Sequence, residues 1–303
     1  MAGPSFRAAP VRIRVPATAA NLGPGFDSLG LALGLYDDVV VRIADSGLHV
    51  DVAGEGADDL PRDKRHLVVR ALRAAFDALG GQPRGLEVVC ANRIPQSRGL
   101  GSSAAAIVAG VTAARHLVLG GISDDDVLAL TAELEGHPDN VAACLLGGVT
   151  IAWRAGDGQV RVTRVDLHPA LRAVVLVPNA KSSTAKARRL LPETVPHADA
   201  AWNAGRAALL VEALTRQPEL LLEATDDRLH QPYRAEAMPR TAALVASLRA
   251  KGLAAAVAGA GPTVLVLGAD RAALERVAAA PPRGWVAHAL DADLGGAQAV
   301  PVG

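Results

Sequence analysis

The sequence has few aromatic residues, only two cysteines and no excess of charge of either sign, and each scarcity excludes a class of protein. Aromatic residues make up 3% of the 303 residues whereas 50% are hydrophobic, so the core must consist mainly of alanine, valine and leucine. Lys+Arg and Asp+Glu each number 31, while a domain that tracks nucleic acid normally carries a basic excess. We therefore expect no nucleic-acid partner.

The two cysteines, Cys90 and Cys144, have apolar neighbours. Such surroundings are typical of small buried thiols and indicate neither a disulfide framework nor a metal site. No hydrophobic run approaches the roughly 18 residues that a membrane span needs, and residues 1–10 lack the apolar centre of a signal peptide. We expect no membrane partner and a cytoplasmic protein.

Hydrophobic periodicity predicts strands and helices in a mixed order. The predicted strands are 11–16, 38–44, 48–52, 86–91, 147–153, 160–165, 171–177, 254–258 and 264–267. The predicted helices are 67–79, 102–119, 124–135, 198–223 and 239–251. Segment 154–159 would join two strands as a hairpin and is the expected boundary between domains 1–156 and 157–303.

Residues 95–105, Pro-Gln-Ser-Arg-Gly-Leu-Gly-Ser-Ser-Ala-Ala, join a predicted strand to a predicted helix. Glycine lets the backbone approach an anion closely, and a helix that starts near Ser102 offers free N–H groups and a positive dipole end. Many Gly-Ser loops of this kind bind nothing, so the segment alone indicates a phosphate site without proving one.

Two common phosphate motifs do not fit this segment. A Walker A loop requires a lysine after its last glycine, and none follows Gly101. The spacing Gly99-x-Gly101-x-x-Ala104 matches the dinucleotide fingerprint, but the preceding loop is long and residues 124–126 open a helix instead of ending a strand. Both families are therefore excluded on context.

The pattern Pro-x3-Gly-Leu-Gly-Ser-Ser-Ala-Ala resembles the central motif of the GHMP kinases, and further segments resemble the homoserine kinases within that family. These are Pro-Ala-Thr-Ala-Ala-Asn-Leu-Gly-Pro-Gly-Phe-Asp at 16–27, Glu-Gly-His-Pro-Asp-Asn-Val at 135–141, the arginine-containing segments 182–192 and 230–234, and Gly-Ala-Gly-Pro-Thr at 259–263. The resemblance implies an α+β kinase fold with two lobes. A β-rich N-terminal lobe would carry the glycine-rich loop, and the C-terminal lobe would be ferredoxin-like.

The resemblance also implies the reaction and the residues that perform it. ATP would phosphorylate the side-chain hydroxyl of L-homoserine with the help of Mg²⁺, giving O-phospho-L-homoserine for threonine biosynthesis, in a homodimer. The implied ATP-binding residues are His66, Pro95, Gln96, Ser97, Arg98, Gly99, Leu100, Gly101, Ser102, Ser103, Ala104 and Ala105. The implied substrate-binding residues are Asn21, Asp27, His137, Asn140, Thr184, Arg188, Arg234 and Gly261. The implied metal ligands are Ser103 and Glu135, and the implied catalytic residues are Ser102, Ser103, Asn140 and Arg188.

The chemistry of these side chains agrees with the implied ligands. Mg²⁺ prefers one or two protein oxygens together with substrate phosphates, which suits Ser103 and Glu135. A guanidinium fork suits the homoserine carboxylate, although 27 of the 31 basic residues are arginine and an isolated one would mean little. Without the motif, Asn21 would be interpreted as a turn residue and Asp27 as a solvated carboxylate.

Asp139 resembles the catalytic aspartate of mevalonate kinase and galactokinase, yet the distance to the next glycine pair contradicts that role. Six residues separate Asn140 from Gly147, one more than in mevalonate kinase, so the position of the base aligns with Asn140. An amide can orient a hydroxyl but cannot take its proton. We hypothesise that no dedicated carboxylate base exists and that the proton passes to the phosphate.

Two alternatives and one departure from the family remain. Another small-molecule GHMP kinase would not need both Arg188 and Arg234, and a catalytically inactive sensor of the same fold should have lost its metal ligands. The family often carries Asn-Leu-Val near the adenine site, where this chain has His66-Leu67-Val68. The nucleotide preference is therefore open.

Overall fold

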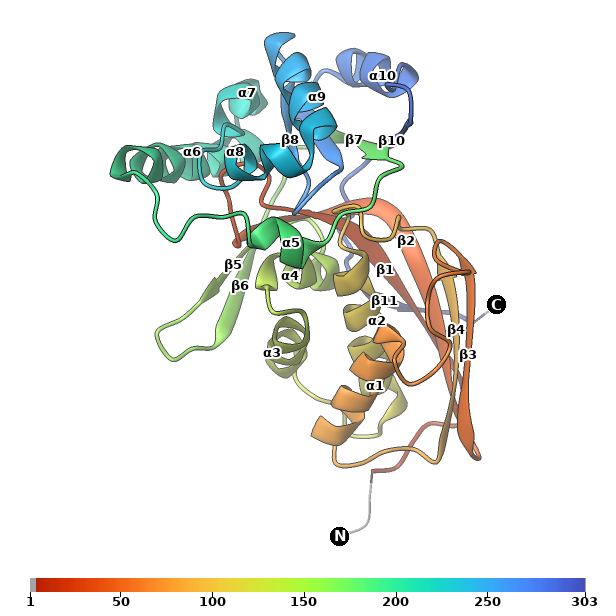
Figure 1. The fold of residues 1–303 in the computed structure, drawn as a ribbon. Helices are drawn as coiled ribbons and strands as arrows, with labels where there is room; N and C mark the ends of the chain where they lie inside the picture. The colour runs from red at the N-terminus through yellow and green to blue at the C-terminus, as the bar shows by residue number, and fades with distance from the viewer. Residues whose placement is uncertain (1–3, 303) are drawn as a thin grey trace.

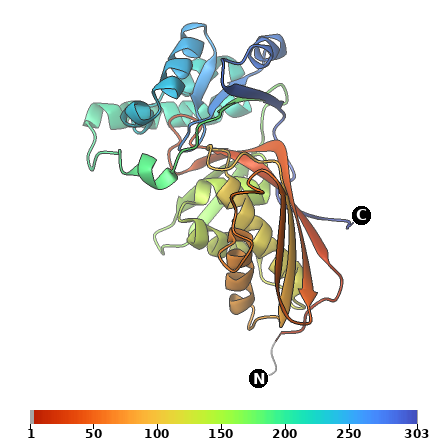
Figure 2. The same cartoon turned by 45° about the vertical axis from the view of Figure 1, so that its right-hand side comes forward.

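The computed structural model describes residues 4–302, which form two lobes, each built on one sheet (Figures 1 and 2). The sheet of the first lobe has seven strands in the order β11-β1-β2-β4-β3, with β5 beside β2 and β6 beside β5. Its strands are β1 (Val11–Ala20), β2 (Leu29–Ala44), β3 (Gly47–Gly54), β4 (Gly85–Asn92), β5 (Val149–Arg154), β6 (Val160–Val165) and β11 (Gln298–Val300).

Four helices lie on one side of this sheet (Figure 1). They are α1 (Leu67–Ala78), α2 (Ser102–Leu117), α3 (Asp124–Glu135) and α4 (Pro138–Leu146). Helix α2 is almost entirely buried, and its small residues allow close packing. A Cβ on Gly110 would lie 2.7 Å from Ala71 Cβ of α1. A core with few aromatic rings thus reaches close packing through small side chains.

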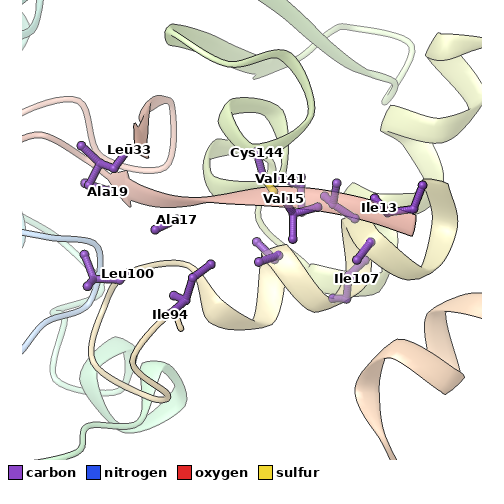
Figure 3. Packing of buried hydrophobic residues seen from close by; sticks show 14 of the residues in the cluster. Ile13, Val15, Ala17, Ala19, Leu33, Ile94, Leu100, Ile107, Val141 and Cys144 are labelled. Atoms are coloured by element: carbon purple, nitrogen blue, oxygen red, sulfur yellow. The ribbon is translucent and has the colours of Figure 1, made fainter. Parts of the chain in front are cut away.

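Strand β1 runs through the middle of this core. Ile107 of α2 and both Val141 and Cys144 of α4 lie around Ile13 and Val15 (Figure 3). The glycine-rich loop packs against the same strand through Ile94 and Leu100, both fully buried. The core therefore fixes the loop and the starts of α2 and α4 relative to β1.

The second lobe holds a four-stranded antiparallel sheet in the order β10-β7-β9-β8. Its strands are β7 (Arg172–Pro178), β8 (Ala254–Val257), β9 (Val264–Gly268) and β10 (Trp285–Leu290), and its longer helices are α6 (His197–Thr215), α9 (Pro239–Ala250) and α10 (Arg271–Ala279). Shorter turns of helix are α5 (Thr184–Arg188), η1 (Pro218–Leu220), α7 (Leu221–Ala224), α8 (Gln231–Arg234) and η2 (Ala235–Ala237). Helices between β7 and β8 and between β9 and β10 give the βαββαβ succession of a ferredoxin-like fold. The predicted α+β fold with two lobes is confirmed.

The first sheet takes strands from both sides of residue 156. β6 pairs with β5 across the turn at 155–159, and β11 returns to pair with β1. The expected boundary between residues 156 and 157 thus lies at the tip of a hairpin, and the division into two domains there stays a prediction. Within residues 4–302 no helix has the length and apolar character to cross a membrane.

Candidate active site

A cavity of about 450 Å³ lies between the two lobes. The first lobe contributes the loop after β1, the start of α1, the glycine-rich loop and the junction of α3 with α4. The second lobe contributes residues around α5, the buried Arg234 and the turn at 259–261. Every segment that resembles a family motif therefore reaches the same cavity.

The glycine-rich loop leaves the N-terminus of α2 open toward this cavity. Gly101 is the N-cap in a left-handed conformation with φ of 69°, and no side chain caps the helix. A Cβ on Gly99 would overlap the Ala258 carbonyl oxygen, so only glycine fits between the loop and the second lobe. Free N–H groups at a helix start attract anions, and this helix start is available for phosphate.

Backbone strain is concentrated in the loops that line the cavity. Among residues 4–302, the non-glycine residues with positive φ are Asn21, Leu22, Asp27 and Ser97. The first three lie in the loop after β1, and Ser97 lies in the glycine-rich loop. Such conformations persist only where surrounding contacts enforce them and they are common at functional sites.

One end of the cavity has several apolar walls and a histidine without partners, with Asp37 and Asn92 also among the lining residues. Val15, Val39, Leu60 and Val68 line this end together with His66. His66 is 3% exposed, and neither ring nitrogen has a hydrogen-bond partner among residues 4–302. Burial lowers the pKa of His66, so the ring is neutral and offers one donor and one acceptor. A flat heteroaromatic base fits both the apolar walls and the free ring nitrogens.

Ser103 in the first turn of α2 contacts Glu135 at the end of α3. The Ser103 hydroxyl donates a hydrogen bond to Glu135 Oε1, and burial raises the pKa of Glu135. Glu135 ends α3, where Gly136 with φ of 85° allows the chain to turn into α4. Two adjacent hard oxygen donors beside a phosphate site fit Mg²⁺, which takes its remaining ligands from phosphate and water. No group of three or more metal-binding side chains occurs in the described part of the chain.

Two arginines and one aspartate form the polar end of the cavity. Arg188 binds Asp27 through two hydrogen bonds, Nη1 to Oδ2 at 2.9 Å and Nη2 to Oδ1 at 2.6 Å. Arg234 is 2% exposed, and its Nε donates to the Ala187 carbonyl oxygen at 3.3 Å. The guanidinium groups of Arg188 and Arg234 lie 5.5 Å and 5.4 Å from the ring centre of Phe26. The two guanidinium groups exceed the single Asp27 carboxylate paired with them, and this excess favours a carboxylate ligand.

Asn21 holds the loop that presents Asp27. Its Nδ2 donates to the Gly259 carbonyl oxygen at 2.9 Å, and its Oδ1 accepts from the Asp27 N–H at 3.1 Å. The side chain thus ties the first lobe to the turn of the second lobe. Although Asn21 lines the cavity, these contacts make it part of the wall, and direct contact with a substrate stays a prediction.

Asp139 and Asn140 lie in the first turn of α4, which begins at Pro138 with His137 as its N-cap. Asp139 is 3% exposed, and burial raises its pKa to about 7. The backbone N–H of Asn140 donates to Asp139 Oδ1 at 2.7 Å. Burial also lowers the pKa of His137, with Arg188 acting in the same direction. The site therefore holds a carboxyl group that ionises near neutral pH and a neutral imidazole.

The structure places most of the predicted site residues in the cavity and a few behind its wall. Those that line it are Asn21, Asp27, His66, Gln96, Ser97, Gly99, Gly101, Ser102, Ser103, Ala105, Glu135, His137, Asn140, Thr184, Arg188, Arg234 and Gly261. Pro95, Leu100 and Ala104 are buried and do not line it. Arg98 donates to the carbonyl oxygens of Gln96, Pro178 and Asn179 and so braces the loop against β7.

Several lining residues were not expected from the sequence. Phe26 belongs to the motif at 16–27, from which no role was predicted for its ring. Ser182 and Ser183, which precede α5, also line the cavity. Asp37 accepts hydrogen bonds from the N–H groups of Arg93 and Ile94 at 2.6 Å and 2.9 Å. Its burial raises the pKa to about 6. The presence of an acidic residue in the largely apolar strand β2 could have indicated that Asp37 holds this backbone segment.

Comparison with known proteins agrees with this geometry. Residues 66–148 match the GHMP kinases N terminal domain, and residues 206–287 match the GHMP kinases C terminal domain. The chain is 63% identical to a homoserine kinase of Streptomyces avermitilis, with 100% of this chain and 99% of the relative aligned. It is 62% identical to a homoserine kinase of Streptomyces coelicolor, with coverage of 100% and 98%. A solved homoserine kinase of Cytophaga hutchinsonii superposes with a TM-score of 0.86 at 26% identity, covering 99% of this chain and 100% of that chain.

Proposed function

The chain belongs to the homoserine kinases of the GHMP kinase family, and we propose that its cavity transfers the γ-phosphate of ATP to the side-chain hydroxyl of L-homoserine. The product is O-phospho-L-homoserine, an intermediate of threonine biosynthesis. One observation carries the assignment of the site. The open N-terminus of α2, the Ser103–Glu135 contact and the Asp27–Arg188 pair all reach one cavity between the lobes.

ATP binds along the first lobe. The adenine occupies the apolar end beside His66, whose ring nitrogens gain their missing partners from the base edge. The phosphates lie against the N–H groups of residues 99–103 and the start of α2. Positioning and charge neutralisation supply most of the catalysis in phosphoryl transfer, and this loop supplies both.

Ser103 and Glu135 hold the Mg²⁺ that accompanies ATP. Bound there, the ion would neutralise charge on the phosphate oxygens. The chain itself contributes the rigid placement of both ligands, because Ser103 lies in the first turn of α2 and Glu135 in the last turn of α3. Their contact across the two helices also argues against an inactive sensor, which should have lost these ligands.

L-homoserine binds at the polar end. Its carboxylate pairs with the guanidinium groups of Arg188 and Arg234, and its ammonium group pairs with Asp27. His137, Asn140, Thr184 and the Gly261 backbone line the same space and orient the side-chain hydroxyl. Galactose has neither a carboxylate nor an ammonium group and mevalonate has no ammonium group, so the combination of two arginines with Asp27 suits the amino acid best.

The transfer itself needs no carboxylate base. The homoserine hydroxyl oxygen attacks the γ-phosphorus, the bond to the bridging oxygen breaks, and ADP leaves with the bond electrons. The hydroxyl proton passes to an oxygen of the transferred phosphoryl group. Asn140 orients the hydroxyl with its amide and cannot accept a proton.

The direct test incubates the purified enzyme and ATP with L-homoserine, mevalonate or galactose. Phosphorylation of each alcohol is measured by ADP release and by ³¹P NMR of the product. We expect turnover with L-homoserine only. Absence of turnover with L-homoserine, or preference for another alcohol, would overturn the substrate assignment.

The metal assignment is tested with Glu135→Ala against a matched control. Glu133→Ala removes an exposed carboxylate two residues earlier on α3. We expect kcat to fall by about 100-fold or more in Glu135→Ala, since the Mg²⁺ that would stabilise the charge of the transition state loses its one charged protein ligand. Glu133→Ala should keep the wild-type rate. An undiminished rate in Glu135→Ala would remove Glu135 from the site.

A homodimer and a cytoplasmic location are proposed on the family resemblance alone. Light scattering of the purified protein and fractionation of the producing cell would test each.

A further inference from the structure

Thr18 of β1 joins the phosphate-binding loop to Asn140. Its side chain is fully buried, and its hydroxyl donates a hydrogen bond to Asn140 Oδ1 at 2.7 Å. Its backbone N–H donates to the Leu100 carbonyl oxygen of the glycine-rich loop at 3.1 Å. One residue therefore contacts both the loop and the amide that lines the cavity.

Gly101 brings the same three elements into direct contact. A Cβ on Gly101 would overlap the Thr18 hydroxyl oxygen and would lie 3.1 Å from Asn140 Oδ1. Gly101 is also the N-cap of α2. The start of α2, the last part of β1 and the start of α4 thus leave no space for any larger residue at this position.

The contacts of Asn140 select one orientation of its amide. Its Nδ2 donates to Asp139 Oδ1 at 3.3 Å. Asp139 Oδ1 also accepts the backbone N–H of Asn140 and so faces Asn140 as an acceptor in either protonation state, whereas a threonine hydroxyl can donate or accept. Asp139 therefore holds the nitrogen side, and Thr18 then donates to the oxygen side. No other partner of the Asn140 amide nitrogen lies among residues 4–302, so its second N–H is available to a ligand in the cavity.

Core packing keeps Thr18 in place. The neighbouring Ala17 and Ala19 belong to the buried cluster around β1 (Figure 3). The pairing of β1 with β2 shifts register between Pro16 and Ala17, two residues before Thr18. Such irregularities are frequent next to active sites, where they redirect a strand. Thr18 sits on a rigid element, while Asn140 sits at a helix end.

We propose that Thr18 is a positioning residue for phosphoryl transfer, which acts by holding the Asn140 amide beside the start of the phosphate-binding helix. Thr18 does not line the cavity, so we expect it to act on the substrates only through Asn140. The inference rests on the proposed function, because it requires that Asn140 orients the homoserine hydroxyl. It predicts that the Thr18 hydroxyl affects the rate of transfer and not the binding of either substrate.

The test compares Thr18→Val, which keeps the shape and removes the hydroxyl, with Thr18→Ser, which keeps the hydroxyl. We expect kcat of Thr18→Val to fall by about 10- to 100-fold, because a misplacement of about 1 Å has an effect of that size. The KM values for ATP and L-homoserine should stay within about twofold. Thr18→Ser should restore most of the rate.

Thr150 of β5 provides a matched control. It is also fully buried in the first sheet, and its hydroxyl has no hydrogen-bond partner in the described part of the chain. Thr150→Val should therefore keep the wild-type kcat. Thermal unfolding of all variants separates loss of rate from loss of fold, and Thr18→Ala replaces Thr18→Val if the valine variant does not fold.

The decisive measurement is the double variant Thr18→Val/Asn140→Ala. If Thr18 acts through Asn140, the double variant is as slow as Asn140→Ala alone. Equal kcat for wild type and Thr18→Val, or multiplied losses in the double variant, would overturn the inference. A fully active Asn140→Ala would instead overturn the proposed role of Asn140. The two failures are thus distinguishable.

Discussion

Replacing Asp139 by asparagine should stabilise the protein above neutral pH and leave catalysis largely intact. Asp139 is buried in the first turn of α4, and its principal contact is with the Asn140 N–H, which donates at 2.7 Å. Asparagine has the same shape and can accept the same hydrogen bond, but it carries no charge. The substitution therefore removes a buried charge without removing its main contact.

The size of the effect follows from the pKa of Asp139. Burial raises that pKa from 3.8 to about 7. Since each pKa unit corresponds to about 1.4 kcal/mol, the ionised form is disfavoured in the folded protein by on the order of 4 kcal/mol. Below pH 3.8 Asp139 is protonated in both the folded and the unfolded state, so its burial costs no stability through ionisation. Between pH 3.8 and 7 the folded state binds more protons, so stability falls as pH rises.

The assay is urea unfolding of wild type and Asp139→Asn at pH 5, 6, 7 and 8. We expect Asp139→Asn to be more stable at pH 8 by a few kcal/mol, and the gain should shrink steadily toward pH 4. Asp58→Asn serves as the control, because Asp58 is exposed and its side chain makes no hydrogen bond among the described residues. A gain that is independent of pH would contradict the reasoning.

The same variant tests the proton route. A dedicated general base contributes about 10²- to 10⁴-fold, whereas an Asp139 that only supports Asn140 should affect kcat by less than about tenfold. A thousandfold loss of kcat in a folded Asp139→Asn enzyme with unchanged KM would identify Asp139 as the base. The hypothesis that the enzyme has no dedicated carboxylate base would then be wrong.

Three further substitutions test the ends of the cavity. His66→Phe keeps a ring without its nitrogens and should raise the KM for ATP by about tenfold with little change in kcat; steady-state kinetics with ATP and GTP would show it. Arg234→Lys replaces a buried fork by a single ammonium and should raise the KM for L-homoserine by at least about tenfold, whereas an unchanged KM would remove Arg234 from the carboxylate site. Asp27→Asn should raise the inhibition constants of L-homoserine analogues that carry the amino group about tenfold more than that of 4-hydroxybutanoate, which senses only the loss of support for Arg188; equal effects on both would show that Asp27 does not bind the ammonium group.

The regular elements of the fold were largely predictable because hydrophobic periodicity is local. Helix α3 and strand β6 have the predicted bounds, 124–135 and 160–165. β1 and β2 extend beyond their predictions, since residues 17–20 and 29–33 are buried on both faces and show little alternation. α10, β10 and β11 near the end of the chain were missed.

Helix α4 shows why part of the site could not be predicted. Residues 135–141 indicated a polar cluster at the end of the predicted helix 124–135, and no helix was predicted after it. In the structure Pro138 occupies the first turn of a new helix, a position that tolerates proline. The motifs thus identified Asp139 and Asn140 as site residues, but not the helix that orients them.

Contacts between distant residues were beyond the sequence. Thr18 lies within a motif, yet its bond to Asn140 depends on how β1 packs against α4. The pairing of Asp27 with Arg188 likewise depends on how the two lobes meet. Side-chain chemistry indicated which ligand each residue suits, and only the packing shows that these two residues hold each other.

The return of β11 to the first sheet sets an order of events during synthesis. Arg12 of β1 pairs with Val300 of β11, so the edge beside β1 stays unpaired until residues 298–300 have left the ribosome. At about 5–20 residues per second, this takes on the order of tens of seconds. The nascent first lobe therefore exposes a strand edge to other chains for that time. A chaperone that covers β1 during translation would shield this edge until β11 closes it.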